Sequence, residues 1–362
     1  MVNYEPKTIE ELSETIRKAS EKKVKIDNIS YVELNKIREI DVDNLTAEVE
    51  RGVTLGKLAQ ELKKKRLIFA PFTPDKEKLT VGEMYSQGVS SLTGAKYGNA
   101  KFHVMGLEVV LANGEILKTG GKTVKNVTGY DLTRVFLSSR DTIGIPVVYT
   151  LKLLPQEEKT VSFLITLTDY HRLKDLLTEL AREKMVPAVC CFWNNSLENK
   201  KQLSLFMELR GIKEKVELEK QKMLKILYSI GAAINEVAGD SLQSIWQKIE
   251  SFSTISGWSD CFKVPQDKLT EFITEINNQQ IISGYWGNPL QGKINIHLKQ
   301  KEKTGELYQK LSTKVNQLGG ATSWYYDFQY GTLNKNLNNI FLKLKEKFDP
   351  QGILKPLRGE TQ

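Results

Sequence analysis

The sequence has 362 residues, of which 40% are hydrophobic and 27% charged, an ordinary balance for a globular protein and enough chain for two domains. The formal net charge is +8, but the lysines alternate with glutamates, as in 211–222, so the charge indicates solvated helix faces and no nucleic-acid partner. No apolar run reaches the roughly 20 residues that span a bilayer, and the acidic start MVNYEPKTIEELSE is not typical of a signal peptide, so we expect a cytoplasmic protein without direct membrane insertion.

The first part of the chain is expected to alternate short strands with helices. Thr8 is the predicted N-cap of the first helix, and Glu11 is its capping-box partner three residues on. Further elements follow from their hydrophobic patterns: a strand over 23–26, a strand over 46–52 and a helix over 55–64.

Two stretches without a clear period come next. Residues 66–80 contain Pro74 and are expected to be an extended loop, and the glycine- and serine-rich residues 81–101 are expected to be a second loop, which at this length is usually functional. Asn113-Gly114 then predicts the turn of a β-hairpin over 104–119. Residues 143–155 have the pattern of a buried strand.

From residue 157 onward, a β-α-β-β-α pattern is expected twice. Such a repeat indicates a duplicated α+β unit with antiparallel strands. Its first round is expected to end in a long helix over roughly 213–238, and its second in a strand over 321–328. The tail reads as a helix followed by an Asp-Pro-x-Gly turn at 349–352.

The chain has three cysteines and three histidines. Cys190 and Cys191 are adjacent, and they form no C-x-x-C spacing with Cys261, so we expect no metal site and a reducing compartment. His297 lies in the expected strand KINIHLK, from which it could face a bound cofactor. It is the candidate general base, and the alternative is a hydrogen-bonded residue of the strand.

Residues 120–145, GGKTVKNVTGYDLTRVFLSSRDTIGI, combine four glycines, two of them adjacent, with small polar residues. This run resembles the second half of the FAD-binding domain of PCMH-type (vanillyl-alcohol-oxidase-like) flavoproteins, and within that family the FAD-binding E-type component of bacterial glycolate oxidases. Further matching motifs are LTVG at 79–82, Tyr97-Gly98, GLEVVLANGEILKTGG at 106–121 and FDPQGILKP at 348–356.

The resemblance implies an α+β fold: a PCMH-type FAD-binding domain of two subdomains over 1–156, a duplicated ferredoxin-like cap over 157–330, and a tail over 331–362 that returns to the flavin domain. It implies FAD as the cofactor, because flavins carry the redox chemistry while the protein orients them. The residues that would hold it are Pro74, Thr80, Gly82, Gly121, Lys125, Gly129, Tyr130, Asp131, Ser139, Thr142, Gly144 and Ile145.

The implied reaction is the oxidation of a 2-hydroxy acid, such as glycolate or lactate, to a 2-oxo acid. The implied partners are a catalytic flavin subunit (D-like) and an iron–sulfur subunit (F-like). Any association with the periphery of a membrane would come through these partners.

The sequence departs from the family in the segments that would meet the cofactor. The place of the glycine-rich loop that wraps the FAD pyrophosphate is taken by residues 23–35, which contain no glycine; Glu83 follows Gly82, and Ser138 and Asp141 stand where the family has glycines. A diphosphate without such N–H donors loses charge-assisted hydrogen bonds of about 1.5–3 kcal/mol each. Two interpretations stay open: a flavoprotein subunit that holds FAD with other groups, or a degenerate non-flavin paralogue that is the structural partner of an active flavin subunit.

Overall fold

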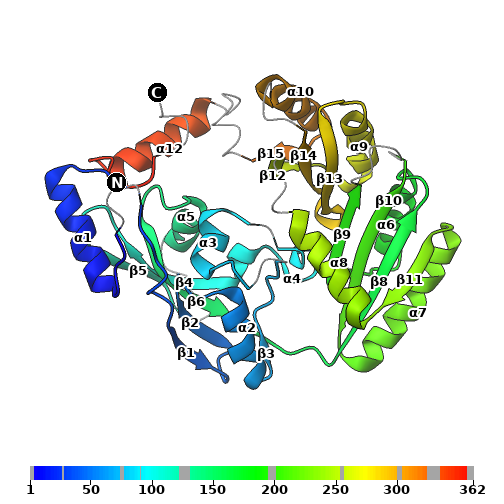
Figure 1. The fold of residues 1–362 in the computed structure, drawn as a ribbon, viewed down its shortest axis with the longest axis horizontal. Helices are drawn as coiled ribbons and strands as arrows, with labels where there is room; N and C mark the ends of the chain where they lie inside the picture. Colours follow the sequence, from blue (N-terminus) through cyan, green and yellow to red (C-terminus); the bar gives the residue numbers. More distant parts are fainter. Residues whose placement is uncertain are drawn as a thin grey trace. The chain divides into compact units, whose positions relative to one another are not determined.

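The computed structural model describes residues 4–26, 28–73, 77–89, 91–121, 131–194, 201–252, 257–299, 304–323 and 335–356. The chain divides into two compact units (Figure 1). Unit 1 comprises residues 1–90, 99–156 and 333–362, and unit 2 comprises residues 91–98 and 157–332.

The short segment 91–98 lies in unit 2, whereas the expected first domain covered all of 1–156. This segment belongs to unit 2 because its polar groups are bonded there. Asn288 donates from Nδ2 to the carbonyl of Leu92 at 3.0 Å, and Lys96 donates from Nζ to the carbonyl of Arg210.

Unit 1 is built on a five-stranded antiparallel sheet in the order β1-β2-β6-β4-β5. Its strands are β1 (Ile37–Asp41), β2 (Thr46–Glu50), β4 (Val104–Val110), β5 (Ile116–Gly120) and β6 (Ile145–Lys152). The helices of this unit are α1 (Ile9–Lys22), α2 (Leu55–Lys64), α3 (Val81–Ser86), α5 (Leu132–Ser138) and α12 (Lys335–Phe348), and the strands β3 (Leu67–Ile68) and β7 (Leu154–Pro155) form a separate pair.

The central strand β6 is buried on both faces, which confirms the buried strand expected within 143–155. One core cluster joins Tyr149 and Leu151 of β6 to apolar residues of α2, α3 and α5. A second cluster joins Val148 to α1 and to Ile353 of the tail. The two faces of the sheet are therefore covered by different helices (Figure 1).

Two local predictions for unit 1 were confirmed, the N-cap at Thr8 and the hairpin turn at Asn113-Gly114. Oγ1 of Thr8 accepts a hydrogen bond from the backbone N–H of Glu11 at 3.1 Å, which confirms Thr8 as the N-cap. The carboxylate of Glu11 accepts from the N–H of Lys7 at 2.8 Å, one residue before the donor that the expected capping box would use. The hairpin turn closes between Leu111 and Glu115, and Gly114 in that turn has φ +85°, a conformation that favours glycine.

Two expectations for unit 1 were wrong. Residues 23–26 form no strand; the N–H of Ile26 bonds instead to the carbonyl of Ile353 at 2.9 Å. Residues 81–101 are not one loop, because they contain the short helices α3, α4 (Gly94–Tyr97) and the 3-10 helix η1 (Ala100–His103). The side chains of Thr80 and Asn99 cap α3 and η1. Gly82 and Gly94 lie where an added Cβ would come within 3.0 Å of a neighbouring side chain, so these glycines allow close packing and do not prevent helix formation.

Unit 2 contains an eight-stranded sheet in the order β11-β8-β10-β9-β13-β14-β12-β15, in which neighbouring strands run antiparallel. The first half consists of β8 (Lys159–Leu167), α6 (Arg172–Arg182), β9 (Val189–Asn194), β10 (Leu203–Gly211), α7 (Lys213–Ser229) and β11 (Ala233–Val237). The second half consists of β12 (Gly257–Lys263), α9 (Leu269–Asn277), β13 (Ile282–Asn288), the 3-10 helix η4 (Pro289–Gln291), β14 (Lys293–Leu298), α10 (Thr304–Gln317) and β15 (Ala321–Thr322).

The strand order confirms the expected duplication. The arrangement β11-β8-β10-β9 of the first half is repeated as β15-β12-β14-β13 in the second, and the two halves join along β9 and β13. Apolar residues of α6, α7, α9 and α10 form one core cluster on the sheet. The additional helix α8 (Gly239–Ser251) contributes Trp246, which packs edge-on against Phe206 at 4.8 Å.

The expectation of one long helix over 213–238 was wrong at the C-terminal end, because the helix covers Lys213–Ser229. Helix α7 stops at Ser229 because Gly231 adopts φ +64° and its N–H bonds back to the carbonyl of Tyr228, a common way to end a helix. The chain then continues as strand β11. Of the strand expected over 321–328, β15 covers the first two residues, and 324–330 lie outside the described residues. In the described part of the chain, no helix has the length and apolar character needed to cross a membrane.

Candidate functional site

The N-terminal end of α3 carries two of the predicted cofactor residues, Thr80 and Gly82. Oγ1 of Thr80 accepts from the N–H of Glu83 at 3.1 Å, and the N–H of Thr80 donates to Oε2 of Glu83 at 2.9 Å. The N–H of Gly82 donates to the carbonyl of Arg51 at 2.8 Å. These donors are therefore bonded within unit 1, and Glu83 is the capping partner of its own helix.

The turn between α5 and β6 holds Ser139 and Thr142 by local hydrogen bonds. Oγ of Ser139 donates to the carbonyl of Phe136 at 2.8 Å, and Oγ1 of Thr142 donates to the carbonyl of Ser139 at 2.7 Å. Arg140 and Asp141 between them have φ +54° and +66°. Both lie in the left-handed region that L-residues enter at a cost of roughly 1–2 kcal/mol each, so other contacts must hold this turn.

The other two predicted residues after this turn have packing roles in the structure. A Cβ on Gly144 would lie 2.8 Å from Cγ1 of Val109 and 2.9 Å from the ring of Phe136, so only glycine fits there. Ile145 begins β6 and is buried in the core cluster that faces α1.

Arg51 joins these segments, although no sequence motif marked it. Its side chain lies just after β2 and is 4% exposed. Its Nη2 is 2.8 Å from Oδ2 of Asp141, and its Nη1 donates to the carbonyl of Pro146 at 2.9 Å. The guanidinium carbon lies 3.9 Å from the centre of the Tyr31 ring, a cation–π geometry. Gly82 is adjacent, since a Cβ on it would be 2.8 Å from Nε of Arg51.

Tyr149 belongs to the same group of side chains. It is fully buried, stacks on Tyr85 with ring centroids 5.4 Å apart, and its hydroxyl has no hydrogen-bond partner among the described residues. Burial raises the pKa of Tyr149, and the positive charge of Arg51 opposes that rise. The hydroxyl is therefore a protonated donor with no acceptor in the described part of the chain.

The start of α5 brings Asp131 and Arg134 together. Asp131 caps the helix by accepting from the N–H of Arg134 at 3.1 Å, and its carboxylate is 3.3 Å from Nε of that arginine. The guanidinium of Arg134 lies 5.0 Å from the Phe102 ring centre, and its Nη1 is buried without a partner among the described residues. Gly121 follows the neighbouring β5, and a Cβ there would meet no atom within 4 Å.

The described residues of unit 1 fit a ligand rich in hydrogen-bond acceptors. Buried side-chain atoms of this unit without a partner in the described part of the chain include Oγ1 of Thr73, Nη1 of Arg134 and the hydroxyl of Tyr149. Buried polar groups are rarely left unpaired, and a flavin dinucleotide presents carbonyl, hydroxyl and phosphate oxygens that would accept from them. The predicted residues Pro74, Lys125, Gly129 and Tyr130 lie outside the described residues.

His297, the candidate base, lies on β14 in unit 2 and is 3% exposed. Its ring hydrogen-bonds to the backbone of Phe252, whose ring centroid is 5.9 Å away, while Nε2 has no partner among the described residues. Burial lowers its pKa from 6.5 to about 4, against the opposing effect of the bond to Phe252. His297 is therefore neutral near pH 7, with a nitrogen lone pair available.

The buried imidazole predicts a specific pH dependence of stability. The pKa of His297 is 6.5 in the unfolded chain and about 4 in the folded one. Between these two pH values, His297 is therefore protonated in the unfolded chain and neutral in the folded chain. The contribution of His297 to the free energy of unfolding is therefore fully present above pH 6.5. As the pH drops toward 4, this contribution falls by about 1.4 kcal/mol per pH unit. We expect His297→Gln to flatten this fall when urea unfolding is measured across the window. Parallel curves for the two proteins would contradict the burial of a neutral imidazole.

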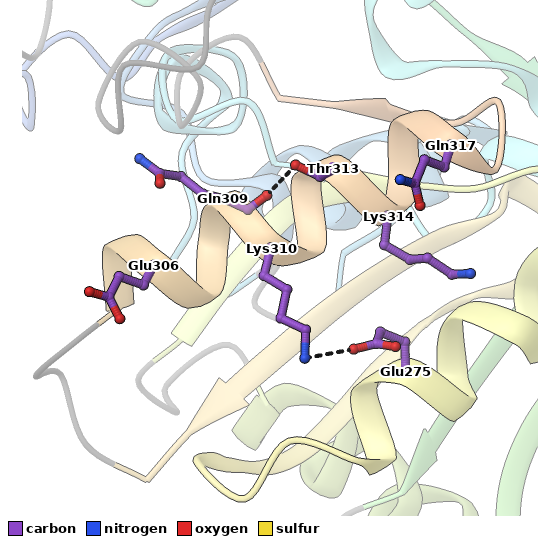
Figure 2. Close-up of a pocket in the computed structure, with 7 residues that line it drawn as sticks. All are labelled: Glu275, Glu306, Gln309, Lys310, Thr313, Lys314 and Gln317. Atoms are coloured by element: carbon purple, nitrogen blue, oxygen red, sulfur yellow. Dashed lines mark hydrogen bonds and ion pairs between the residues drawn. The ribbon is translucent and has the colours of Figure 1, made fainter.

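The described part of unit 2 also contains a surface depression and two buried cysteines. A surface depression of about 510 Å³ lies along α10 and α9, and Figure 2 shows Lys310 pointing to Glu275, with their charged atoms 3.1 Å apart. Such exposed ion pairs belong to solvated helix faces. Cys190 and Cys191 are buried, and burial raises the pKa of both thiols. The structure groups no three His, Cys, Asp or Glu side chains around a possible metal position within its described ranges.

Residues 28–120 match the family model described as "FAD binding domain". The chain is 26% identical to the glycolate oxidase subunit GlcD of Bacillus subtilis, over 90% of this chain and 77% of that protein. It is 23% identical to the glycolate oxidase subunit GlcE of Escherichia coli, over 78% and 72%. It is 35% identical to a D-lactate dehydrogenase of Archaeoglobus fulgidus, over 41% and 33%.

Solved structures show the same fold. The structure of p-cresol methylhydroxylase with substrate bound superposes with a TM-score of 0.77 at 16% identity, covering 98% of this chain and 87% of that one. That of alkyldihydroxyacetonephosphate synthase superposes with a TM-score of 0.73 at 15% identity, covering 97% and 75%. The expected PCMH-type α+β fold, the FAD binding domain and the likeness to glycolate oxidase subunits are thereby confirmed.

Proposed function

We propose that this chain, which carries an FAD binding domain on a PCMH-type fold, is the FAD-binding subunit of an oxidoreductase that converts a 2-hydroxy acid to a 2-oxo acid. The observation that carries the proposal is the similarity over 90% of the chain to a glycolate oxidase subunit. A D-lactate dehydrogenase of Anaerostipes hadrus is similar over 91% of the chain at 24% identity. Glycolate and D-lactate share the α-hydroxy carboxylate, so that group is the proposed substrate class.

The oxidation removes two electrons and two protons from the hydroxyl-bearing carbon and its oxygen. FAD, when bound, supplies the acceptor for the electron pair. The chain must supply a group that takes the hydroxyl proton, and we propose Nε2 of His297, which is buried, neutral and without a partner among the described residues. In unit 1, Thr73, Arg134 and Tyr149 are the proposed donors to the cofactor, since each has a buried polar atom without a described partner.

The visible spectrum of the purified protein tests the first part of this proposal. We expect the absorption bands of an oxidised flavin with close to one FAD per chain, and bleaching of those bands when glycolate or D-lactate is added without oxygen. A folded, colourless protein that takes up no added FAD would overturn it.

A second candidate function is supported by the contacts of Arg51 and α3. The donors at the start of α3 are bonded within unit 1, and Arg51 is paired with Asp141. A chain with these contacts could keep the fold without the cofactor and serve as the structural partner of an active flavin subunit. It is distinguished from the first candidate by the flavin content of the chain purified alone.

The names of the relatives as subunits GlcD and GlcE support an assembly with a catalytic flavin subunit. We propose an iron–sulfur subunit as a further member, which would take electrons onward. Capture of the tagged chain from its native cells, followed by mass spectrometry, should recover both partners in fixed stoichiometry. Recovery of the chain alone at native expression would count against the assembly.

A further inference from the structure

We propose that Arg51 is the cation that binds the diphosphate of the dinucleotide, and that Asp141 is a built-in counterion that must leave Arg51 before the diphosphate can bind. The inference rests on the proposed function for the identity of the dinucleotide. It adds a residue that the sequence motifs do not contain, and it explains how a chain without the glycine-rich loop can hold an anion.

Three segments that the resemblance assigns to the cofactor meet at Arg51. Tyr31, from the segment that replaces the glycine-rich loop, lies under the guanidinium at 3.9 Å. Gly82 bonds to the Arg51 carbonyl at 2.8 Å, and Asp141 bonds to Nη2 at 2.8 Å. The guanidinium is buried, with Tyr31 on one face, Nη2 on Asp141 and Nη1 on the carbonyl of Pro146. A guanidinium held in this way is suited to phosphate oxygens, which it can bind in pairs.

The hydroxyl of Tyr149 is a second, independent indication of a ligand. It is buried, has no partner among the described residues, and lies close enough to Arg51 and Asp141 for their charges to act on its ionisation. An unpaired buried hydroxyl costs about 1–3 kcal/mol. A phosphate oxygen beside Arg51 would accept its hydrogen.

Asp141 has the properties of a displaceable group. It keeps φ +66°, beside Arg140 at +54°, in a region that favours glycine. The ion pair with Arg51 offsets that strain, so a ligand that takes over Arg51 also lets the turn relax. Asp141 is the more accessible partner, with its side chain 14% exposed against 4% for Arg51.

The experiment compares Asp141→Asn with Glu108→Gln, which removes the same charge from unit 1 at a site paired with Arg38 and Lys118 and not with Arg51. We measure FAD affinity by quenching of flavin fluorescence and the unfolding temperature of the FAD-free protein. For Asp141→Asn we expect about tenfold tighter FAD binding, equal to about 1.4 kcal/mol, together with a lower unfolding temperature. Asp141→Gly, which suits the positive φ, should show the same tighter binding.

If Asp141 has only a structural role, Asp141→Asn and Asp141→Gly should both bind FAD more weakly and unfold at a lower temperature. That result would overturn the proposal, and so would an FAD affinity that is unchanged in both variants. Pyrophosphate as a second probe separates this inference from the proposed function. If no variant binds FAD but pyrophosphate raises the unfolding temperature of Asp141→Asn and not of Glu108→Gln, the anion site stands while the flavin function fails. If the wild type binds FAD and pyrophosphate stabilises neither variant more than the wild type, Arg51 is not the diphosphate site.

Discussion

Replacing Lys345 by methionine is expected to lower the free energy of unfolding of unit 1 by about 3–5 kcal/mol, because it leaves a buried carboxylate without its cation. Nζ of Lys345 is 2.5 Å from Oδ2 of Asp349, and it also donates to the carbonyls of Thr142 at 2.9 Å and Lys355 at 3.1 Å. Asp349 is fully buried and accepts from the N–H groups of the tail.

These contacts fasten α12 and the tail to the turn before β6, which is the turn that holds Asp141. The loss is therefore expected to affect FAD retention as well as stability. Lys347→Met is the matched control, since Lys347 is exposed on the same helix and its loss should change stability by less than about 0.5 kcal/mol. Urea unfolding of both variants makes the comparison. Equal midpoints would show that the buried pair contributes nothing, and a double change of Lys345 and Asp349 to apolar residues should recover part of the loss.

Sequence patterns predicted those parts of the fold that depend on residues close in the chain. The cap at Thr8, the hairpin at Asn113-Gly114 and the doubled β-α-β-β-α pattern each have a local physical cause, and each is present. The early end of α7 does not follow from the apolar pattern, because it depends on the positive φ of Gly231, which ends the helix.

The candidate site was less predictable, because its main contacts join residues far apart in the sequence. Arg51 and Asp141 are separated by 90 positions and meet only after β2 and β6 pair. One sequence feature could have pointed to this pair. Asp141 stands at a position where the family has a glycine, and a carboxylate placed there needs a cation such as Arg51 nearby. Two of the predicted glycine positions mark close packing, because neither Gly82 nor Gly144 leaves room for a Cβ.

The residues of the longest motif stay predictions. The run that carries the resemblance includes Lys125, Gly129 and Tyr130, which lie outside the described residues, so their proposed roles rest on the family likeness. Asp131, at the end of that motif, caps α5 and pairs with Arg134, and this gives the motif a structural reason for an acidic residue there.

Replacing His297 by glutamine is expected to lower the rate of 2-hydroxy-acid oxidation by about 10²–10⁴-fold, the usual contribution of a general base. Glutamine keeps a polar side chain that can still hydrogen-bond to the backbone of Phe252, but it cannot take a proton at the position of Nε2. The change therefore separates the chemical role of His297 from its place in the fold, and bound FAD should be retained.

The pH profile gives the second readout. With a pKa of about 4, His297 is the free base over the neutral range, so the wild-type rate should be level there and fall only as the pH approaches 4 and the imidazole takes up a proton. The variant should lack this acid limb. The control is His171→Gln, since His171 is exposed at the start of α6 and its replacement should leave the rate unchanged.

Rates are measured as anaerobic bleaching of the bound flavin by D-lactate or glycolate. If His297→Gln binds FAD and reacts within about threefold of the wild type, well short of the loss of a general base, the proton goes to another group, and His297 is a buried residue of strand β14 without a part in the reaction.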